Sequence, residues 1–533
     1  MLFRHTQGRA TRVAVGSLAA LAVCATLCIS AVVAQASDKA LKRAERALRE
    51  GEYELAEKLF LEVVSKEAHN SRARLGLSYA LLKQRKLQGA YDHAAYVLAA
   101  NPHSSRAHAL VGAAVLASGN FRVSVAEFRT ALSIKDDEAL AIAGLAMVDF
   151  YENRLQDSLI KLRRAHFIDP REPDYIFNLA QTAARTERYR EAADAYERFL
   201  DIAPHTDEDR RARIRGLIDF LRYLGKQGPL YIPGGASSTV VPFYTTDHRP
   251  VIHVRVNGSK VPLRFVLDTG SGMTVISDET ARRLGLSAVA RGGLARAVGG
   301  GGRFEIVYGF LDSIHIGEAR MANVPVYIRR FYDKDNPVDG YIGLSVISKF
   351  ITTVDYGART FMLMRQRSGD IDPASAPTDI EIPIRTTLSG FLSGEVHLDG
   401  VSKPLNFIID TGASISVVSE VLMASEGMSR FAQSTRMRVY GAAGVTEDVT
   451  MLLLPRIIFG SYAHNHIRAA VLDLEPINET AGFAQNGILG ANFLRHFRIT
   501  FDFQRAVIRL EPLTAPAPEN QGVRRTSAIT ERP

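Results

Sequence analysis

The chain has 533 residues, a length that predicts about three or four domains. Hydrophobic residues make up 46% and charged residues 23% of it, which excludes a wholly disordered or collagen-like chain. The net charge of +8 comes without a long Lys or Arg run, which argues against nucleic acid as the main partner. The only cysteines are Cys24 and Cys28, so the rest of the chain cannot hold a cysteine protease, a thiolate zinc site or a disulfide scaffold.

Residues 1–36 have the layout of a secretory signal peptide. A basic start is followed by an uncharged stretch at residues 13–34 and by the small-x-small pattern Ala34-Gln35-Ala36. We favour a cleaved signal, but the apolar stretch is also close to the length that spans a bilayer, so an uncleaved inner-membrane anchor is the alternative. In both cases the basic end stays inside, so we expect an exported protein, with the periplasm as its compartment.

Residues 38–225 repeat with a period of 34. At one position of the repeat the residues are large and apolar, three positions later they are small, and proline stands near the end of three copies. The large residues are Tyr53, Leu87, Phe121, Leu155 and Tyr189, the small ones are Ala56, Ala90, Ser124, Ser158 and Ala192, and the prolines are Pro102, Pro170 and Pro204. Small residues allow two helices to cross closely, and proline follows the second helix because it cannot continue it.

This pattern resembles the tetratricopeptide repeat, with about five copies over residues 38–205. The resemblance implies an all-α solenoid whose concave face binds a peptide or another protein. We expect a further helix at about residues 207–224 to cap the stack with a polar outer face. Three roles stay open for the repeats: to recruit substrate, to tether a partner, or to support the second half of the chain. Five copies in register disfavour an unrelated helical bundle.

After a Gly- and Pro-containing stretch at residues 226–237, which we interpret as a linker, helical periodicity stops. Short β-branched runs separated by Gly, Asn and Asp predict strands. Residues 254–271 and 396–413 match each other, and each reads as a hairpin whose returning apolar strand ends in Asp-Thr-Gly. The match continues along the chain and predicts a duplicated β unit at residues 238–370 and 380–512.

The two copies carry Asp268-Thr269-Gly270-Ser271 and Asp410-Thr411-Gly412-Ala413, each followed about 75–80 residues later by an apolar-apolar-Gly triplet. One Asp-Thr-Gly is weak evidence, but the whole constellation, present twice, resembles the aspartic proteases. The short copies are similar to retropepsin-like proteases, and the tandem order is similar to pepsin. The closest description is a fused, pseudo-dimeric retropepsin-like protease. The resemblance implies a multidomain α and β chain, with an all-β, double-lobed protease fold after the helical repeats.

The chemistry explains why two copies are needed. Peptide hydrolysis requires one group that takes a proton from water and another that gives a proton to the amide, and two carboxyl groups sharing a site can do both. Each copy supplies one aspartate, so a pseudo-twofold axis must bring Asp268 and Asp410 together around a water. Two like charges at such a site cannot both ionise easily, so the pair shares its protons.

The family resemblance implies supporting roles for the neighbours of these aspartates. Thr269 and Thr411 match the threonines that make a cross-lobe hydrogen-bond grip, and Gly343 and Gly490 match a structural glycine behind the loop. Gly270 and Gly412 let the loop turn sharply beside the carboxylate. Ser271 and Ala413 complete the two active-site loops and differ from each other, so the lobes are unequal.

Glycine-rich segments follow each aspartate at the same offset and match the family's flap, a hairpin over the cleft. The residues we assign to flaps and substrate binding are Gly299, Gly300, Gly301, Tyr440 and Gly441. Glycines permit the opening that a bound peptide requires. Two ordinary loop hairpins are the alternative interpretation, and Tyr440 could serve packing instead of substrate contact.

Other chemistries fit the sequence poorly. A His-Glu-x-x-His pair, a Gly-x-Ser-x-Gly elbow and a phosphate loop are absent, so we expect neither a metal nor another cofactor. We expect an exported aspartic endopeptidase that acts on a protein or peptide, with a protein partner or substrate on the repeats and contact with a membrane only through an uncleaved N-terminal segment. The alternatives are a non-catalytic peptide-binding scaffold and pairing of each copy with its counterpart in another chain. The Pro-rich tail at residues 513–533 predicts disorder.

Overall fold

The computed structural model describes residues 38–300, 302–365, 381–425 and 427–513. The predicted signal segment, Gly301 and the tail beyond residue 513 lie outside these ranges. By its contacts the chain divides into two compact units. The first holds residues 38–115, 122–141 and 203–206, and the second holds residues 116–121, 142–202 and the chain from residue 207 onward.

The N-terminal part is an all-α solenoid of paired helices, as the 34-residue period predicts. The helices are residues 38–49, α2 (Tyr53–Lys66), α3 (Ser71–Lys83), α4 (Leu87–Ala100), α5 (Ser105–Ala117), α6 (Phe121–Ile134), α7 (Ala139–Tyr151), α8 (Leu155–Ile168), α9 (Pro173–Arg185), α10 (Tyr189–Ile202) and α11 (Glu208–Leu224). In the first unit α2, α3 and α4 pack in succession, and in the second unit α8 to α11 do the same.

Small residues stand where the helices cross. Ala56, Ala90, Ser124, Ser158 and Ala192 are all completely buried. In the first unit, a Cβ at Gly112 would lie 2.7 Å from the ring of Phe128, so only glycine lets that ring approach the helix. The small column of the repeat is therefore a packing column, and the large column fills the space beside it.

The second half is built from β-strands and a few short helices. The strands are β1 (Ile232–Gly235), β2 (Ser238–Pro242), β3 (Tyr244–Thr246), β4 (Arg249–Val256), β5 (Leu263–Leu267), β6 (Val275–Ser277), β7 (Ala290–Arg296), β8 (Arg303–Ile316), β9 (Ala319–Arg329), β10 (Gly340–Ile342), β11 (Phe350–Asp355), β12 (Thr360–Arg365), β13 (Glu381–Thr386), β14 (Leu392–Leu398), β15 (Leu405–Ile409), β16 (Ser416–Ser419), β17 (Ala432–Gly441), β18 (Gly444–Phe459), β19 (Tyr462–Leu472), β20 (Gly487–Leu489), β21 (Phe497–Asp502) and β22 (Val507–Pro512). The short helices are α12 (Asp278–Arg283), α13 (Leu344–Ile347), α14 (Glu420–Ser425), a 3-10 turn (Met428–Phe431), α15 (Glu475–Ala481) and α16 (Ala491–Leu494).

The two copies have the same topology. In the first, β5 pairs in parallel with β10, and Leu267 lies opposite Ile342; in the second, β15 pairs in parallel with β20, and Ile409 lies opposite Leu489. The sheet orders agree as well: the first lobe runs β9-β6-β10-β5-β4 and the second runs β19-β16-β20-β15-β14. The internal sequence match therefore reports a structural duplication.

A shared sheet joins the lobes. Strands β11 and β21 pair antiparallel, which links β2 and β12 of the first copy to β13 and β22 of the second. At the junction the hydroxyls of Thr353 and Thr500 lie 3.0 Å apart. One hydrophobic core runs through both lobes, with Phe265, Phe361, Phe407 and Phe501 completely or almost completely buried in it. The lobes therefore fold as one body, which fixes the geometry of anything built between them.

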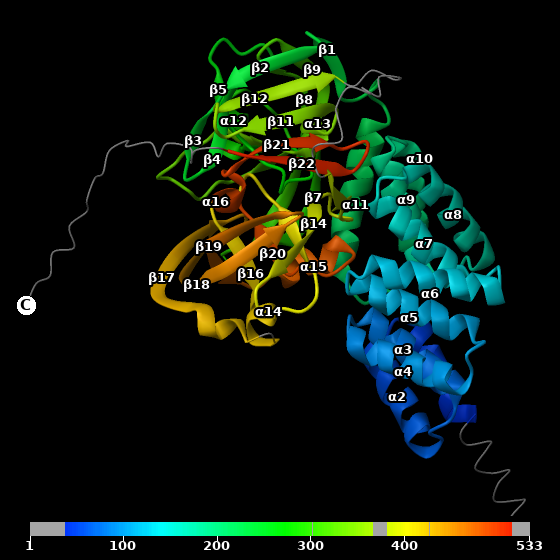
Figure 1. The fold of residues 1–533 in the computed structure, drawn as a ribbon. Helices are drawn as coiled ribbons and strands as arrows, with labels where there is room; N and C mark the ends of the chain where they lie inside the picture. Colours follow the sequence, from blue (N-terminus) through cyan, green and yellow to red (C-terminus); the bar gives the residue numbers. More distant parts are fainter. Residues whose placement is uncertain (1–37, 301, 366–380, 426, 514–533) are drawn as a thin grey trace, which may run out of the picture. The chain divides into compact units, whose positions relative to one another are not determined.

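One expectation needs correction. The stretch at residues 226–237 is not only a linker, because β1 pairs with β9 and forms the edge strand of the first lobe's sheet. Helix α11 packs on β7 (Figure 1), and Arg215, Asp219 and Arg222 on its other face are exposed, as expected of a capping helix with a polar outer face. A Cβ at Gly216 would lie 2.0 Å from the carbonyl oxygen of Arg291, so the helix contacts the strand backbone directly.

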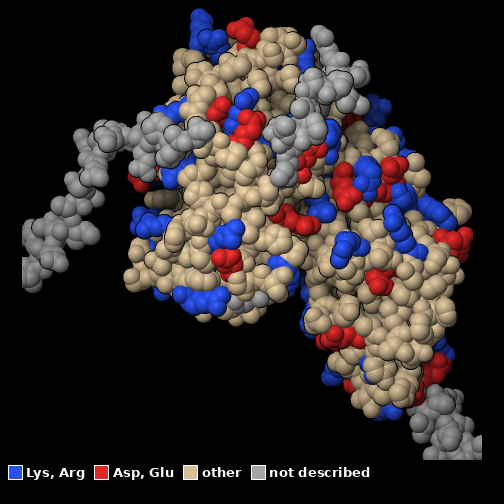
Figure 2. Space-filling model, viewed as in Figure 1, with Lys and Arg blue, Asp and Glu red and all other residues tan. Residues whose placement is uncertain are grey.

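On the face shown in Figure 2, basic and acidic side chains are interspersed, and neither sign dominates. A single-sign field of the kind that attracts nucleic acid is therefore not seen on that face. Among the described residues, none of the helices combines the length and hydropathy needed to cross a bilayer.

Candidate active site

Asp268 and Asp410 occupy equivalent places at the ends of two strands. Each follows an apolar strand, β5 or β15, and donates its backbone N–H to the strand that lies parallel to it. The acceptors are the carbonyl oxygens of Ile342 and Leu489, each at 3.0 Å. The same local sequence therefore holds both aspartates in the same way.

The threonines after the aspartates bind across the lobes. The Thr269 hydroxyl donates to the carbonyl of Ile409 at 2.7 Å, and the Thr411 hydroxyl donates to the carbonyl of Leu267 at 2.7 Å. Each hydroxyl also accepts from the opposite threonine's N–H, at 3.1 and 3.2 Å. Both threonines are buried, so these four hydrogen bonds are shielded from water. They lock the two loops face to face.

Each glycine of the Asp-Thr-Gly loops makes room for the opposite carboxylate. A Cβ at Gly270 would lie 2.2 Å from Cγ of Asp410, and a Cβ at Gly412 would lie 2.6 Å from Oδ1 of Asp268. The two carboxyl groups lie close enough for each to shift the pKa of the other. The structure thus brings the two aspartates of one chain side by side. A site formed with a second chain is not needed for this pair.

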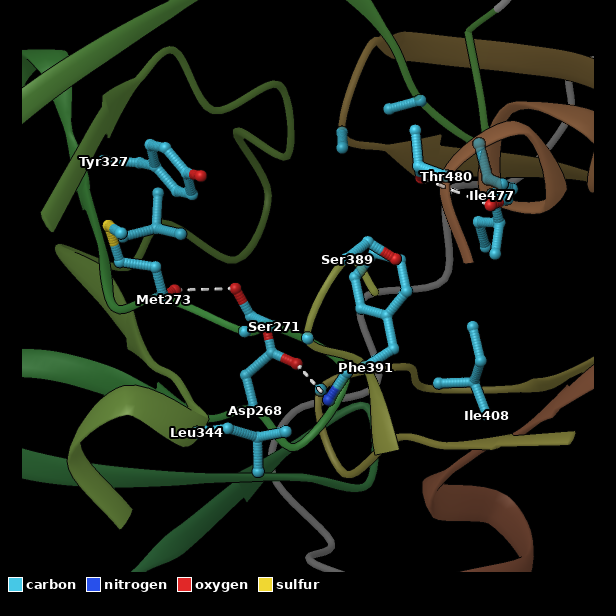
Figure 3. A pocket seen from close by; sticks show the side chains of 18 of the residues that line it. Asp268, Ser271, Met273, Tyr327, Leu344, Ser389, Phe391, Ile408, Ile477 and Thr480 are labelled. Atoms are coloured by element: carbon cyan, nitrogen blue, oxygen red, sulfur yellow. Dashed lines mark hydrogen bonds between the residues drawn. The ribbon is translucent and has the colours of Figure 1, made fainter. Parts of the chain in front are cut away.

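The surroundings of the two carboxyl groups differ. Oδ1 of Asp410 accepts from the N–H groups of Gly412 at 2.7 Å and Ala413 at 3.0 Å, whereas Oδ1 of Asp268 accepts from Gly270 at 3.0 Å. Ser271 turns its hydroxyl away and donates to the carbonyl of Met273 at 2.8 Å (Figure 3). The N–H of Ser271 donates to the backbone carbonyl of Asp268 at 3.4 Å, whereas the N–H of Ala413 donates to the carboxylate of Asp410, so the two loops differ at the aspartates.

These differences set the charge of the pair. Burial raises the pKa of both carboxyl groups, and the nearby charge of Asp410 raises the pKa of Asp268 further. The backbone N–H groups around Asp410 and its bond to Asp268 oppose the rise in the pKa of Asp410, because they stabilise the anion. The pair shares a proton, and the two N–H donors at Oδ1 of Asp410, against one at Oδ1 of Asp268, favour the ionised form of Asp410.

The aspartates line a cleft of about 1820 Å³ between the lobes. Figure 3 shows Asp268 and Ser271 on one side of it, with Ser389 and Phe391 of the second lobe facing them. Residues from α9 and α11, among them Arg185 and Leu217, form a further wall of the same cleft. The opening is large enough for several residues of an extended peptide.

Two hairpins reach over the cleft, and their tips meet. Gly299 and Gly300 stand between β7 and β8, and Gly441 ends β17. A Cβ at Gly299 would lie 2.7 Å from Cα of Gly441, and the N–H of Gly300 donates to the hydroxyl of Thr446 at 2.6 Å. Tyr440 lines the cleft and is 39% exposed. The two glycine-rich segments therefore touch each other at the cleft, and their role as flaps stays a prediction.

The first hairpin is fastened to helix α11. Arg213 of α11 donates to the carbonyl of Leu294 at 3.0 Å. The ring of Phe220 stacks on Tyr308 with 4.1 Å between centroids. Arg303 forms an ion pair of 2.6 Å with Asp209, beside the start of the helix. The repeat domain thereby contacts the hairpin that covers the aspartates.

Sequence reasoning missed the helical wall of the cleft and one cleft residue, Arg329 at the end of β9. The wall depends on how the end of the solenoid packs on the lobes, which no local pattern reveals. Arg329 could have been found by aligning the two copies beyond the Asp-Thr-Gly loops. In the described part of the chain, the structure contains no cluster of His, Cys, Asp and Glu that could hold a metal ion.

Comparisons with known protein families give separate matches for the two halves of the chain. Residues 252–346 and 394–493 match the aspartyl protease family. Residues 47–114 and 144–205 match tetratricopeptide repeat families. Two tandem aspartyl protease segments therefore follow the repeats. No curated protein matches the chain.

Several solved structures that resemble the chain are tetratricopeptide repeat proteins. They include a thermophilic TPR protein of Thermus thermophilus, which is 18% identical with a TM-score of 0.30 and covers 34% of this chain and 98% of its own. MamA of Desulfovibrio magneticus is 19% identical with a TM-score of 0.23 and covers 32% of this chain and 97% of its own. Pseudomonas aeruginosa pilF is 13% identical with a TM-score of 0.28, and covers 36% and 85%. At these TM-scores the likeness says nothing about function.

Proposed function

Because this chain carries two tandem aspartyl protease segments behind tetratricopeptide repeats, we propose that it is an aspartic endopeptidase whose catalytic pair is Asp268 and Asp410. The observation that carries the proposal is that the two Asp-Thr-Gly loops are locked face to face, which sets the carboxyl groups of Asp268 and Asp410 side by side within one chain. A structural or peptide-holding lobe has no need of two buried acids side by side, since their mutual repulsion costs stability.

The reaction follows from the charges of the pair. The ionised carboxylate of Asp410 takes a proton from a water while that water's oxygen attacks the peptide carbonyl carbon. The protonated Asp268 gives its proton to the carbonyl oxygen, which yields a neutral tetrahedral intermediate. The proton on Asp410 then passes to the amide nitrogen, a hydroxyl proton returns to Asp268, and the C–N bond breaks. The pair ends as it began, so it can turn over repeatedly.

The surrounding groups support this reaction in distinct ways. The grip of Thr269 and Thr411 holds the carboxyl groups at one separation, which pre-organises them for proton transfer. The hairpins at Gly300 and Gly441 cover the cleft and exclude water from the bound peptide. Their glycine-rich tips separate to admit substrate.

The repeats bring a protein to this site. Repeats of this family serve protein–protein interaction, and α9 and α11 form part of the wall of the cleft. A substrate protein bound to the repeats could therefore insert one of its segments into the cleft without dissociating from the repeats. Residues 1–36 direct the enzyme out of the cytoplasm, to the periplasm, either as a cleaved signal or as an anchor in the inner membrane.

The test is peptide cleavage by the full chain. Wild type, Asp268→Asn and Asp410→Asn are incubated with a library of internally quenched peptides at acidic to neutral pH. We expect cleavage by wild type and a loss of at least about a thousandfold in kcat/KM for either variant, because each removes one member of the acid–base pair. Binding of peptides without cleavage at any pH, or cleavage that survives either substitution, would instead support the non-catalytic scaffold.

A further inference from the structure

One half-buried cation in the cleft forms no ion pair with the described residues. Arg329 ends β9, lines the cleft and lies near Asp268. Burial lowers the pKa of its guanidinium, and its Nε is buried without a hydrogen-bond partner. Within the part of the chain that the structure describes, this side chain has no ion pair, and the nearby carboxylate of Asp333 pairs with Arg249 instead.

The groups that surround Arg329 favour its charged form but do not form an ion pair with it. The guanidinium carbon lies 5.7 Å from the centre of the Phe304 ring, a weak cation–π contact. Tyr341, Tyr332 and Asp268 are close enough to favour its charged form, but none forms an ion pair with it. Proteins seldom bury a cation without a partner, because the lost hydration is not recovered. A ligand that brings a carboxylate into the cleft would supply the missing partner.

The duplication supplies an internal comparison. In the first lobe β6 pairs in parallel with β9, and Ser277 lies opposite Arg329. In the second lobe β16 pairs in parallel with β19, and Ser419 lies opposite Leu472. Leu472 therefore holds the place in the second lobe that Arg329 holds in the first.

The environment of Leu472 is apolar. It lines the same cleft, is 6% exposed and belongs to a cluster that includes Ile408, Val417 and Ile477. The walls on the two sides of the aspartates are thus built on one backbone plan with opposite chemistry, a cation on one side and a hydrocarbon surface on the other. A fold that only needed to fill this position could have used an apolar residue in both copies.

We infer that Arg329 forms a subsite that selects a substrate carboxylate, an Asp or Glu side chain, on one side of the scissile bond, while the Leu472 side accepts an apolar residue. This inference rests on the proposed protease function. A guanidinium binds a carboxylate through two parallel hydrogen bonds, which explains the choice of arginine at a site that must recognise an acid. In this role Arg329 determines specificity and takes no part in the proton transfers.

The first experiment uses matched peptides. Cleavage sites found with the library are resynthesised as pairs that differ only in Glu or Gln near the scissile bond, with acetylated and amidated ends. We expect wild type to prefer the Glu peptide by about ten- to a hundredfold in kcat/KM, as a charge-assisted pair would give. The Arg329→Leu variant, which copies the second lobe, should cleave both peptides of a pair at similar rates.

The controls separate specificity from a general effect on the dyad. Arg329→Lys keeps the charge and should keep part of the preference, and Arg330→Leu changes an exposed neighbour and should behave as wild type. Arg329 also lowers the pKa of Asp268, so the deciding quantity is the Glu-to-Gln ratio of kcat/KM within each variant, which a general effect on the dyad leaves unchanged. An equal loss on every peptide, or no Glu preference in wild type, would overturn the inference.

A binding arm covers the case in which nothing is cleaved. Fluorescence anisotropy with labelled Glu and Gln peptides is measured on wild type and on Arg329→Leu. A Glu preference that disappears in the variant would support the subsite while the protease proposal fails, and equal binding of both peptides would overturn the subsite. Peptides with a free C-terminus form a second set, because a preference confined to them would show that the carboxylate recognised is terminal, against the side-chain proposal.

Discussion

Placing a methyl group at Gly270 tests the geometry of the aspartate pair most directly. In Gly270→Ala the new Cβ would lie 2.2 Å from Cγ of Asp410, whereas ordinary carbon contacts begin at 3.4 Å. One of the two groups must therefore move by about 1.2 Å. Displacements of about 1 Å in a catalytic group cost roughly a hundredfold in rate. Overpacking of this kind also costs about 1–3 kcal/mol of stability.

The assay measures kcat/KM on one cleaved peptide together with the free energy of unfolding in urea. We expect Gly270→Ala to lose at least about a hundredfold in kcat/KM while it remains folded. Gly412→Ala, whose Cβ would meet Oδ1 of Asp268 at 2.6 Å, should behave alike because the lobes are related by the duplication. Gly228→Ala is the matched control, since its Cβ would have no atom within 4 Å. A folded Gly270→Ala variant with near wild-type kcat/KM would refute the side-by-side placement of the aspartates.

Three further predictions concern stability. Thr411→Val removes a hydroxyl that donates to Leu267 and accepts from Thr269, so it should lower the free energy of unfolding by about 2–4 kcal/mol. A loss under about 0.5 kcal/mol in urea titrations would contradict the buried hydrogen bonds between the two threonine loops. The raised pKa of Asp268 means that the folded state keeps a proton that the unfolded state releases above about pH 4, so wild-type stability falls as pH rises through that raised pKa. Asp268→Asn should remove this fall and raise Tm at neutral pH, and an unchanged Tm would count against the coupling. Burial lowers the pKa of His496 to about 4, so stability should be lost as pH falls from about 6.5 to 4, and His496→Asn should flatten that part of the pH profile in thermal melts.

The sequence by itself determined the architecture and the identity of the paired acids. A 34-residue period in small and large residues can satisfy only a stack of helix pairs, and the structure places Ala56 and Ala192 at buried crossings. Two matching apolar strands that end in Asp-Thr-Gly similarly predicted two lobes with one aspartate each. The helical repeats and the two lobes could be predicted because local periodicity and an internal sequence repeat are properties of the sequence itself.

Only the tertiary structure decided how the parts act on each other. The contact of α11 with the hairpin at Leu294 joins residues that no shared pattern connects, and it arises because one face of α11 packs on β7 of the first lobe. The inequality between Asp268 and Asp410 depends on which N–H groups surround each carboxylate. The equivalence of Arg329 in the first lobe and Leu472 in the second becomes visible only when the strand registers of the two lobes are compared. Charge, burial and partners are properties of the folded neighbourhood, so a residue's type alone could not disclose them.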